Sequence, residues 1–363
     1  MQQKPQPEPL LESAPEICSR LIKAAQNASV SDIHIQPQQD GSADVSFRLD
    51  GVLSKTESLS AEVASLVIGR IKFLAKLKTY EHSIPQDGRI DRNDAGIEHE
   101  LRVSTYPTVS GEKIVIRLFT EETIKPLDQL GLDLGTFNIL QGFLHQRQGL
   151  MLLTGPSGSG KTTTIYSCLK HLLSSDSRHI ITVEDPVEQI IPGIMQTEIN
   201  EVRGLNFPKS IRHLLRQDPE VIVIGEIRDD ETADIAIRAA LTGHQVIATL
   251  HAGSCHGVID RLRVMVDDHF ALTAVLKVIV NQRLVRRCCE NCDARGCEQC
   301  AHTGYHGRVP LVETLTIGEQ DFATLQQGRP FTRTPSPNLK QAAEKLINLQ
   351  VTDNREINRI LGI

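Results

Sequence analysis

The stretch Gly155-Pro156-Ser157-Gly158-Ser159-Gly160-Lys161-Thr162 follows the apolar residues 150–153 and opens a helical pattern that runs from Thr163 to residue 173. It fits the motif G-x-x-x-x-G-K-[ST] between a strand and a helix, the context that gives this motif meaning. Its glycines let backbone N–H groups turn inward around phosphates, and the helix N-terminus adds partial positive charge. We therefore predict an ATP site at residues 155–163.

Two side chains of this loop have defined roles in phosphate-loop proteins. Lys161 is expected to reach the β and γ phosphates of ATP, and Thr162 is expected to ligate Mg²⁺. The competing interpretation is a Gly-rich turn that merely precedes a helix. The flanking strand and helix disfavour that interpretation.

The chain after this loop alternates strands and helices, as a parallel, doubly wound α/β sheet requires. Three apolar runs are typical of buried strands, namely residues 180–183, 221–224 and 246–250, with Glu184, Glu226 and His251 at or near their ends. Polar residues at the carboxyl ends of such strands are where an open α/β sheet binds its ligand.

Length and composition indicate the number of domains and the classes of partner and location to expect. The chain has 363 residues, which predicts two domains with appendages. A net charge of −6 argues against a protein that coats nucleic acid over a broad surface. Residues 1–15 are rich in Pro, Gln and Glu and predict a disordered tail. No run approaches the length of a spanning helix, so we expect a cytoplasmic protein.

Before the ATP site, patterns of short strands and two helices predict a compact α+β domain at residues 16–120. Its helices are expected at 16–28 and 61–77, and Asp40-Gly41 and Asp50-Gly51 are turn signals between strands. The remaining divisions are expected to be a linker at 121–135, an ATPase domain at 136–313 and a C-terminal helical region at 314–363 that contains an amphipathic helix at 339–349.

The chain resembles the secretion ATPases of the type II secretion, type IV pilus and competence family from residue 28 to residue 313. In the sheet domain, residues 181–188 resemble the family's aspartate box, 221–229 its Walker B motif, and 240–244 with His251-Ala252 its histidine box. The motifs of the first domain are Ser31-Asp32-Ile33-His34, Arg48-Leu49-Asp50-Gly51, Pro85-Gln86-Asp87-Gly88-Arg89-Ile90, Leu101-Arg102-Val103-Ser104-Thr105 and Gly111-Glu112-Lys113.

The resemblance implies a RecA-like ATPase domain preceded by a smaller α+β, PAS-like domain. Glu226 is then expected to hold the Mg²⁺ shell and Glu184 to act as general base, although the two roles are interchangeable at this stage. His251 is placed to sense the γ phosphate. The resemblance also implies that Arg89 and Arg102 compensate the charge of the nucleotide. Each residue also has a purely structural interpretation. The two glutamates would be surface carboxylates that cap strands, the histidine would be structural, and the two arginines would lie on a solvent-exposed face.

Cys289, Cys292, Cys297 and Cys300 form two C-x-x-C pairs, which predict one structural Zn²⁺ site. Zn–S bonds of about 2.3 Å require sulfurs roughly 3.8 Å apart. Only four residues separate the pairs, fewer than is usual in the family, but Gly296 allows a tight reversal. Cys288 competes with Cys289 as a ligand, and two disulfides or free thiols are the alternatives to zinc.

The function that this resemblance implies is a hexameric cytoplasmic ATPase that powers assembly of a pilus or pseudopilus. Its expected partners are an inner-membrane platform protein and other assembly components, through which it associates with the membrane, and no direct nucleic-acid binding is expected. Alternatives are a pilus retraction ATPase, a conjugative or DNA-translocating ATPase, and a regulatory ATP-binding module without turnover. The short segment before the first helix resembles members that lack an extra N-terminal docking domain.

Overall fold

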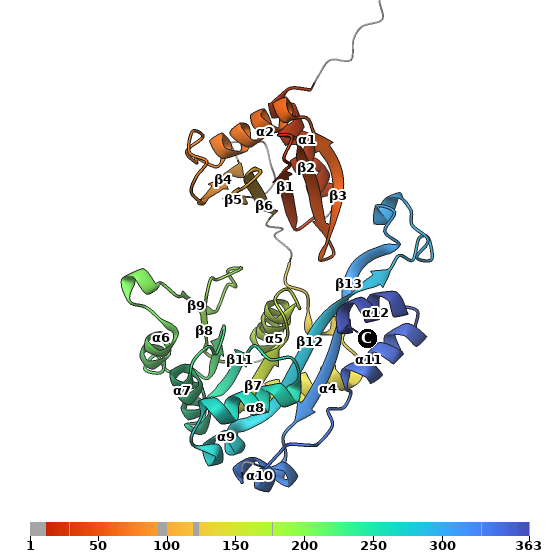
Figure 1. The fold of residues 1–363 in the computed structure, drawn as a ribbon. Coiled ribbons are helices and arrows are strands. Elements are labelled where there is room, and N and C mark those ends of the chain that lie inside the picture. Colours follow the sequence, from red (N-terminus) through yellow and green to blue (C-terminus); the bar gives the residue numbers. More distant parts are fainter. Residues whose placement is uncertain are drawn as a thin grey trace, which may run out of the picture. The chain divides into compact units, whose positions relative to one another are not determined.

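The computed structural model describes residues 12–28, 30–92, 100–118, 123–175, 177–327 and 329–362. The chain divides into two compact units, Met1–Thr123 and Ile124–Ile363, and each is described by itself (Figure 1). The first has an antiparallel sheet and the second a mixed, mostly parallel sheet, which confirms the predicted fold class. The finer domain boundaries stay predictions.

The first unit is a six-stranded sheet of order β3-β2-β1-β6-β5-β4, covered on one face by two helices (Figure 1). Alternate residues such as Ile33 and Ile35 of β1 are fully buried against α1 and α2. Its elements are α1 (Ala14–Asn27), β1 (Asp32–Pro37), β2 (Ala43–Leu49), β3 (Val52–Leu59), α2 (Ala61–Leu74), β4 (Gln86–Ile90), β5 (Leu101–Thr108) and β6 (Gly111–Leu118).

Both hairpin turns predicted in this unit are present. β1 pairs with β2 and β2 with β3, each antiparallel. Asp50 and Gly51 have φ of 49° and 81°, and two consecutive positive φ values belong to the two-residue turn that suits the twist of a hairpin. The Asp-Gly sequence therefore fixes this connection locally.

The predicted disordered tail is too long at its C-terminal end. Residues 1–11 lie outside the described residues, but α1 already begins at Ala14. The backbone N–H of Ser13 donates to the Glu16 carboxylate at 2.8 Å, and Pro15 occupies the first turn, where its missing N–H costs nothing. Local capping thus starts the helix inside a segment whose composition indicated disorder.

The second unit is a seven-stranded sheet of order β13-β12-β7-β11-β10-β8-β9. Every neighbouring pair in this described sheet is parallel except β12–β13. Its elements are η1 (Leu127–Gln129), α4 (Leu134–Leu144), β7 (Gly149–Thr154), α5 (Lys161–Ser175), β8 (Ile180–Glu184), β9 (Met195–Glu198), η2 (Glu201–Arg203), α6 (Phe207–Leu214), β10 (Val221–Ile224), α7 (Asp230–Leu241), β11 (Gln245–Thr249), α8 (Cys255–Met265), α9 (His269–Val275), β12 (Leu276–Cys288), η3 (Glu298–Cys300), β13 (Tyr305–Thr316), α10 (Glu319–Gln326), α11 (Leu339–Asn348) and α12 (Asn354–Leu361).

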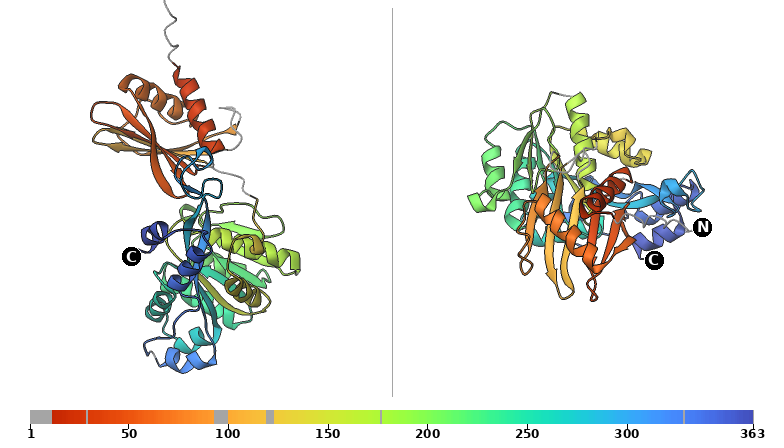
Figure 2. Two further views of the ribbon diagram at one scale, coloured as in Figure 1. Left: turned by 90° about the vertical axis from the view of Figure 1, so that its right-hand side faces the viewer. Right: turned by 90° about the horizontal axis from the view of Figure 1, so that it is seen from above.

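Helices cover both faces of this sheet (Figure 2). Met151 and Leu153 of β7 pack with α4 and α5, whereas Leu150 and Leu152 pack with the helices from α6 to α9. Because both faces are covered, the central strands are continuously apolar rather than alternating. Leu127, in the predicted linker, is buried with α4 and α5, so that part of the linker packs on the second unit.

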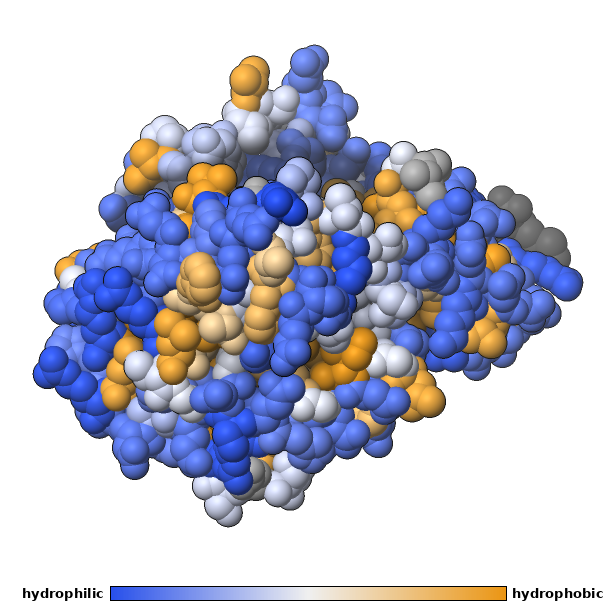
Figure 3. Space-filling view, turned by 90° about the horizontal axis from the view of Figure 1, so that it is seen from below, coloured by the Kyte–Doolittle hydropathy of each residue, from blue (hydrophilic) through white to orange (hydrophobic). Residues whose placement is uncertain are grey.

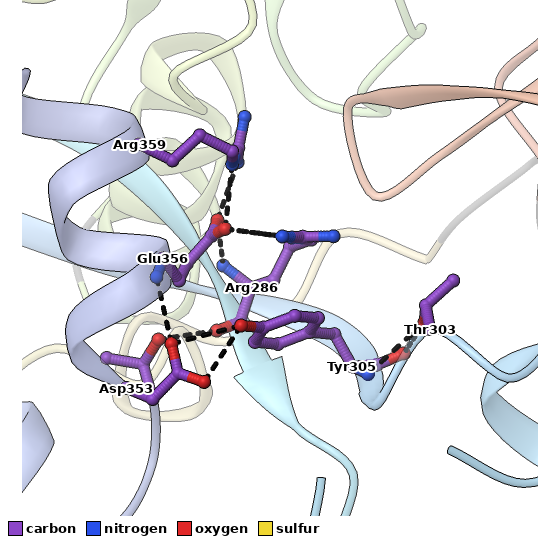
Figure 4. Close-up of polar contacts among 7 residues, drawn as sticks. Arg286, Thr303, Tyr305, Asp353, Glu356 and Arg359 are labelled. Atoms are coloured by element: carbon purple, nitrogen blue, oxygen red, sulfur yellow. Dashed lines mark hydrogen bonds and ion pairs between the residues drawn. The ribbon is translucent and has the colours of Figure 1, made fainter. Parts of the chain in front are cut away.

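The C-terminal helices pack on the β12–β13 pair of their own chain. Helix α11 matches the amphipathic helix predicted at 339–349, and α12 is an additional helix that the sequence did not reveal. A buried ionic cluster attaches α12 to β12 (Figure 4). Arg286 and Arg359 both donate to the Glu356 carboxylate, and Tyr305 donates to Asp353.

Apolar side chains on the surface seen from below occur in small patches among hydrophilic ones (Figure 3). Such scattered apolar residues are normal for a protein surface and indicate no particular partner. Within the described residues, no helix has the length and apolar character needed to cross a membrane.

Candidate functional site

The phosphate loop lies at the carboxyl end of β7 and leads directly into α5. Gly155, Gly158 and Gly160 all have positive φ, at 143°, 72° and 85°. A Cβ on Gly155 would lie only 2.2 Å from the Gln282 carbonyl oxygen. The loop therefore needs glycine for its backbone shape and for close packing on β12.

Lys161 bends back over the loop from the first residue of α5. Its ammonium donates to the carbonyl oxygens of Gly155 at 2.9 Å and Pro156 at 3.1 Å. Partial burial lowers the pKa of Lys161, although the nearby Glu226 carboxylate acts in the opposite direction. Both carbonyl contacts are ones that a phosphate can replace, so the ammonium is available to a polyphosphate ligand.

A cleft joins the phosphate loop helix to the carboxyl ends of the neighbouring strands. Its lining includes Thr162 from α5, Glu184 from β8 and Glu226 after β10. Three residues predicted from separate motifs therefore meet in one cleft. This is the arrangement that an open α/β sheet gives to residues at its carboxyl edge.

Glu184 is the most constrained of these carboxylates. Its side chain accepts hydrogen bonds from Tyr166, from Thr182 at 2.5 Å and from Gln196 at 3.1 Å, and the residue is 6% exposed. Burial, followed by the Glu184 carboxylate, raises the pKa of Tyr166. The Tyr166 hydroxyl therefore stays a proton donor to Glu184, which is held in one orientation toward the cleft.

Glu226 lies at the centre of a polar cluster at the mouth of the cleft. Arg228 Nε is 2.7 Å from one carboxylate oxygen, and His251 Nε2 is 3.1 Å from the other. Arg228 also pairs with Asp185 at 3.3 Å. The predicted Walker B acid and the predicted histidine are thus in direct contact, which the sequence alone did not indicate.

Glu188 was not singled out from the sequence, yet it lines the same cleft. Its Oε1 lies 3.5 Å from Thr162 Oγ1, at the outer limit for a hydrogen bond. Glu188 is the last residue of the stretch that resembles the aspartate box. Its position four residues after Glu184, beyond a strand end, is the signal that would have identified it.

The predicted arginines of the first unit belong to a larger set. A single row of residues in register crosses its sheet: Arg89, Arg102, Arg117, Asp32 and Arg48. Directly opposed residues share a face, and the buried neighbours Leu101 and Ile116 place this row on the face away from α1 and α2. Arg89 pairs with Glu100 at 3.1 Å. Arg117 is the member that motif comparison missed.

The four predicted cysteine ligands lie together, all with Sγ atoms within 4.8 Å of one another. The Sγ separations are 3.9 Å for Cys289 and Cys297, and 3.8 Å both for Cys292 and Cys300 and for Cys297 and Cys300. These values match the spacing of sulfurs around tetrahedral zinc. Cys288 lies outside the cluster, so Cys289 is the member of that pair with ligand geometry.

The two cysteine pairs lie in two copies of one turn. In each copy, a backbone N–H two residues after the second cysteine donates to the carbonyl of the first, from Ala294 to Cys289 at 3.2 Å and from His302 to Cys297 at 2.8 Å. Ala294 and His302 both have positive φ, at 62° and 58°. The four-residue spacer is therefore sufficient, because each turn reverses the chain within itself.

Further donors point at the sulfurs. The backbone N–H of Gly296 donates to Cys292 Sγ and that of Cys297 to Cys300 Sγ, each at 3.2 Å. A hydrogen bond from the Asn291 side chain lowers the pKa of Cys297 to about 6. Donors aimed at sulfur stabilise thiolates, which are the form that binds metal. This donor set fits a tetrahedral thiolate site.

Comparison with known proteins identifies the family that the sequence motifs resemble. The family described as Type II/IV secretion system protein matches residues 11–359. The type II secretion system protein E of Aeromonas hydrophila is 40% identical over 87% of this chain and 69% of its own length. The type IV pilus assembly ATPase PilB of Thermus thermophilus is 39% identical over 90% of this chain, which spans only 40% of that relative.

Solved structures show the same fold. The Legionella pneumophila ATPase DotB superposes with a TM-score of 0.70 at 23% identity, covering 98% of both chains. The pilus retraction motor PilT with bound ADP superposes with a TM-score of 0.64 at 24% identity, covering 94% of this chain and 96% of the other. At such identities the likeness shows the fold alone.

Proposed function

Because the chain belongs to the type II/IV secretion system ATPase family, we propose that it hydrolyses ATP with Mg²⁺ to power assembly of a pilus or pseudopilus. The observation that carries the proposal is the convergence of Thr162, Glu184 and Glu226 on one cleft beside Lys161. A regulatory ATP-binding module would not need this set of carboxylates.

Each side chain has a proposed role in hydrolysis. Lys161 supplies positive charge to the transferring phosphoryl group. Thr162 and Glu226 would hold Mg²⁺, which when bound neutralises charge on phosphate oxygens. Glu184, fixed by its hydrogen bonds, orients water and accepts its proton, and His251 senses the phosphate through its contact with Glu226.

Glu184→Gln is expected to keep ATP binding while turnover falls at least about 100-fold, because an amide cannot accept the proton of the attacking water. Binding and phosphate release are measured on the same preparation. Tyr166→Phe is the matched control, since it removes one hydrogen bond to Glu184 but leaves the carboxylate. If only Glu226→Gln shows this separation of binding from turnover, the two carboxylates exchange roles.

We further propose that Cys289, Cys292, Cys297 and Cys300 bind one structural Zn²⁺. Four thiolates leave no open coordination position, so the ion would stabilise the segment that connects β12 to β13 rather than take part in chemistry. The sulfur spacings and the two matching turns support this assignment over disulfides.

Purified protein is expected to contain about one zinc per chain, as measured by elemental analysis. The double substitution Cys292→Ser with Cys297→Ser should lose the metal and lower the melting temperature, because metal binding contributes to folding. Cys288→Ser, outside the cluster, should retain the zinc. Reduced, metal-free wild type with unchanged stability would contradict the site.

Assembly and partners are proposed on the family alone. The functional unit is proposed to be a homohexamer that acts in the cytoplasm on an inner-membrane platform protein. Charge compensation by Arg89 and Arg102 likewise stays a prediction. Loss of turnover in the single variants Arg89→Ala and Arg102→Ala, with the fold intact, would support it.

A further inference from the structure

Asn281, Gln282 and Arg283 are three consecutive polar residues of β12 that belong to no motif identified in the sequence. β12 runs parallel to β7, and Asn281 is the register partner of Thr154, the residue before the phosphate loop. Side chains of a strand alternate between two faces, so Gln282 projects to one side and its neighbours to the other. The tripeptide can therefore contact two different loops.

Gln282 is 2% exposed, and its amide bonds to both the phosphate loop and the helix that follows. Its Nε2 donates to the Ser159 carbonyl oxygen at 2.8 Å, and its Oε1 accepts from Thr164 Oγ1 at 2.9 Å. A Cβ on Gly160 would lie 2.8 Å from Nε2, so the amide fills the space beneath the loop. It fixes the peptide before Gly160 relative to the first turn of α5.

Asn281 and Arg283 hold the loop after β11. Asn281 Nδ2 and Arg283 Nη2 donate to the Gly253 carbonyl oxygen at 3.2 Å and 2.9 Å. Arg283 Nη1 donates to Asn281 Oδ1 at 2.7 Å, and Asn281 Nδ2 also donates to the buried Glu313 carboxylate at 3.0 Å. Gly253 follows His251 by two residues, so this network supports the histidine loop.

We propose that Gln282 is a positioning residue that holds the phosphate loop in its phosphate-binding shape, while Asn281 and Arg283 position the His251 loop from the same strand. The inference rests on the proposed ATP hydrolysis and concerns residues that act through the two loops they hold. Backbone N–H groups bind phosphate only when the loop is preorganised. Loss of the Gln282 amide should therefore weaken ATP binding in a folded protein.

Gln282→Met tests this with little change in size and no change in charge. The variant removes both the donor to Ser159 and the acceptor for Thr164. The dissociation constant for MgATP is expected to rise at least about tenfold, because two buried polar groups beside the loop lose their partner. Thr164→Val, which removes only one of these hydrogen bonds, should raise it by a smaller factor.

Gln245→Met is the matched control. Gln245 is a fully buried amide on β11, but its Nε2 donates to the carbonyls of Phe143 at 2.7 Å and Gln146 at 2.8 Å, beside the amino ends of the strands. It should lower the melting temperature while the MgATP dissociation constant changes by less than about twofold, since distant sites act independently.

Titration of a fluorescent ATP analogue and thermal melting of the full chain separate the outcomes. Selective loss of affinity in Gln282→Met supports the proposal. Wild-type affinity in Gln282→Met, or equal losses in Gln282→Met and Gln245→Met, overturns it. Failure of the wild type itself to bind ATP would instead contradict the proposed function.

Discussion

Lys161→Ala is expected to reduce ATP turnover at least about 100-fold, because it removes the preorganised charge that we propose faces the transferring phosphoryl group. The ammonium already bends over the loop through hydrogen bonds to Gly155 and Pro156, so little reorganisation is needed when ATP binds. Alanine retains helix propensity at this first residue of α5, so the fold should survive.

Phosphate release under saturating ATP measures this effect. Lys170→Ala is the matched control, because Lys170 is an exposed lysine of the same helix whose ammonium donates to the Ile124 carbonyl. Lys170→Ala should keep wild-type turnover. Turnover close to wild type in Lys161→Ala would mean that residues 155–163 are not the phosphate-binding site.

Glu356→Gln is expected to destabilise the second unit by about 3–5 kcal/mol, the cost of breaking a buried ion pair while its partners remain. Glu356 is fully buried and accepts from Arg286 and Arg359 at 2.6–2.9 Å, as Figure 4 shows. An amide leaves two guanidinium groups without a countercharge. The melting temperature should fall by at least about 6 °C for a unit of this size.

The pH dependence of stability gives a second readout for Glu356. Burial acts to raise the pKa of Glu356, but the hydrogen bonds from Arg359 and Arg286 outweigh burial and hold this pKa at about 2, below its usual value of 4.5. The stabilisation is therefore fully present above about pH 4.5 and is lost as pH falls toward about 2. Glu356→Gln should lose this component of acid sensitivity.

Glu344→Gln, on the exposed face of the neighbouring helix α11, is the control and should change the melting temperature little. Equal melting curves for Glu356→Gln and Glu344→Gln would contradict the role given to the buried cluster.

Features with a local signature could be predicted from the sequence. The phosphate loop and the cysteine pairs each have a fixed spacing that reflects their chemistry, and Glu184 and Glu226 follow apolar runs that are typical of buried strands. The Asp50-Gly51 turn and the apolar strands of the second sheet were likewise predictable, because turn geometry and burial on both faces constrain residue type directly.

Features that depend on distant partners could not be predicted. Gln282 and Thr164 are separated by 118 residues, and a lone glutamine in a strand has no pattern of its own. Glu356 lies in a short helix rich in charged residues, a pattern typical of a helix exposed to solvent. Its side chain is nevertheless fully buried and pairs with Arg286. Arg117 joins Arg89 and Arg102 only through strand register.

The most direct test of the proposed ATPase activity is phosphate release from ATP by the purified full chain, in buffer with Mg²⁺ and in buffer from which Mg²⁺ alone is omitted. We expect turnover with Mg²⁺ and none without it, because Thr162 and Glu226 line the cleft in which we propose that they hold that ion. Absence of turnover in both buffers, or equal turnover in both, by protein that binds ATP would contradict it.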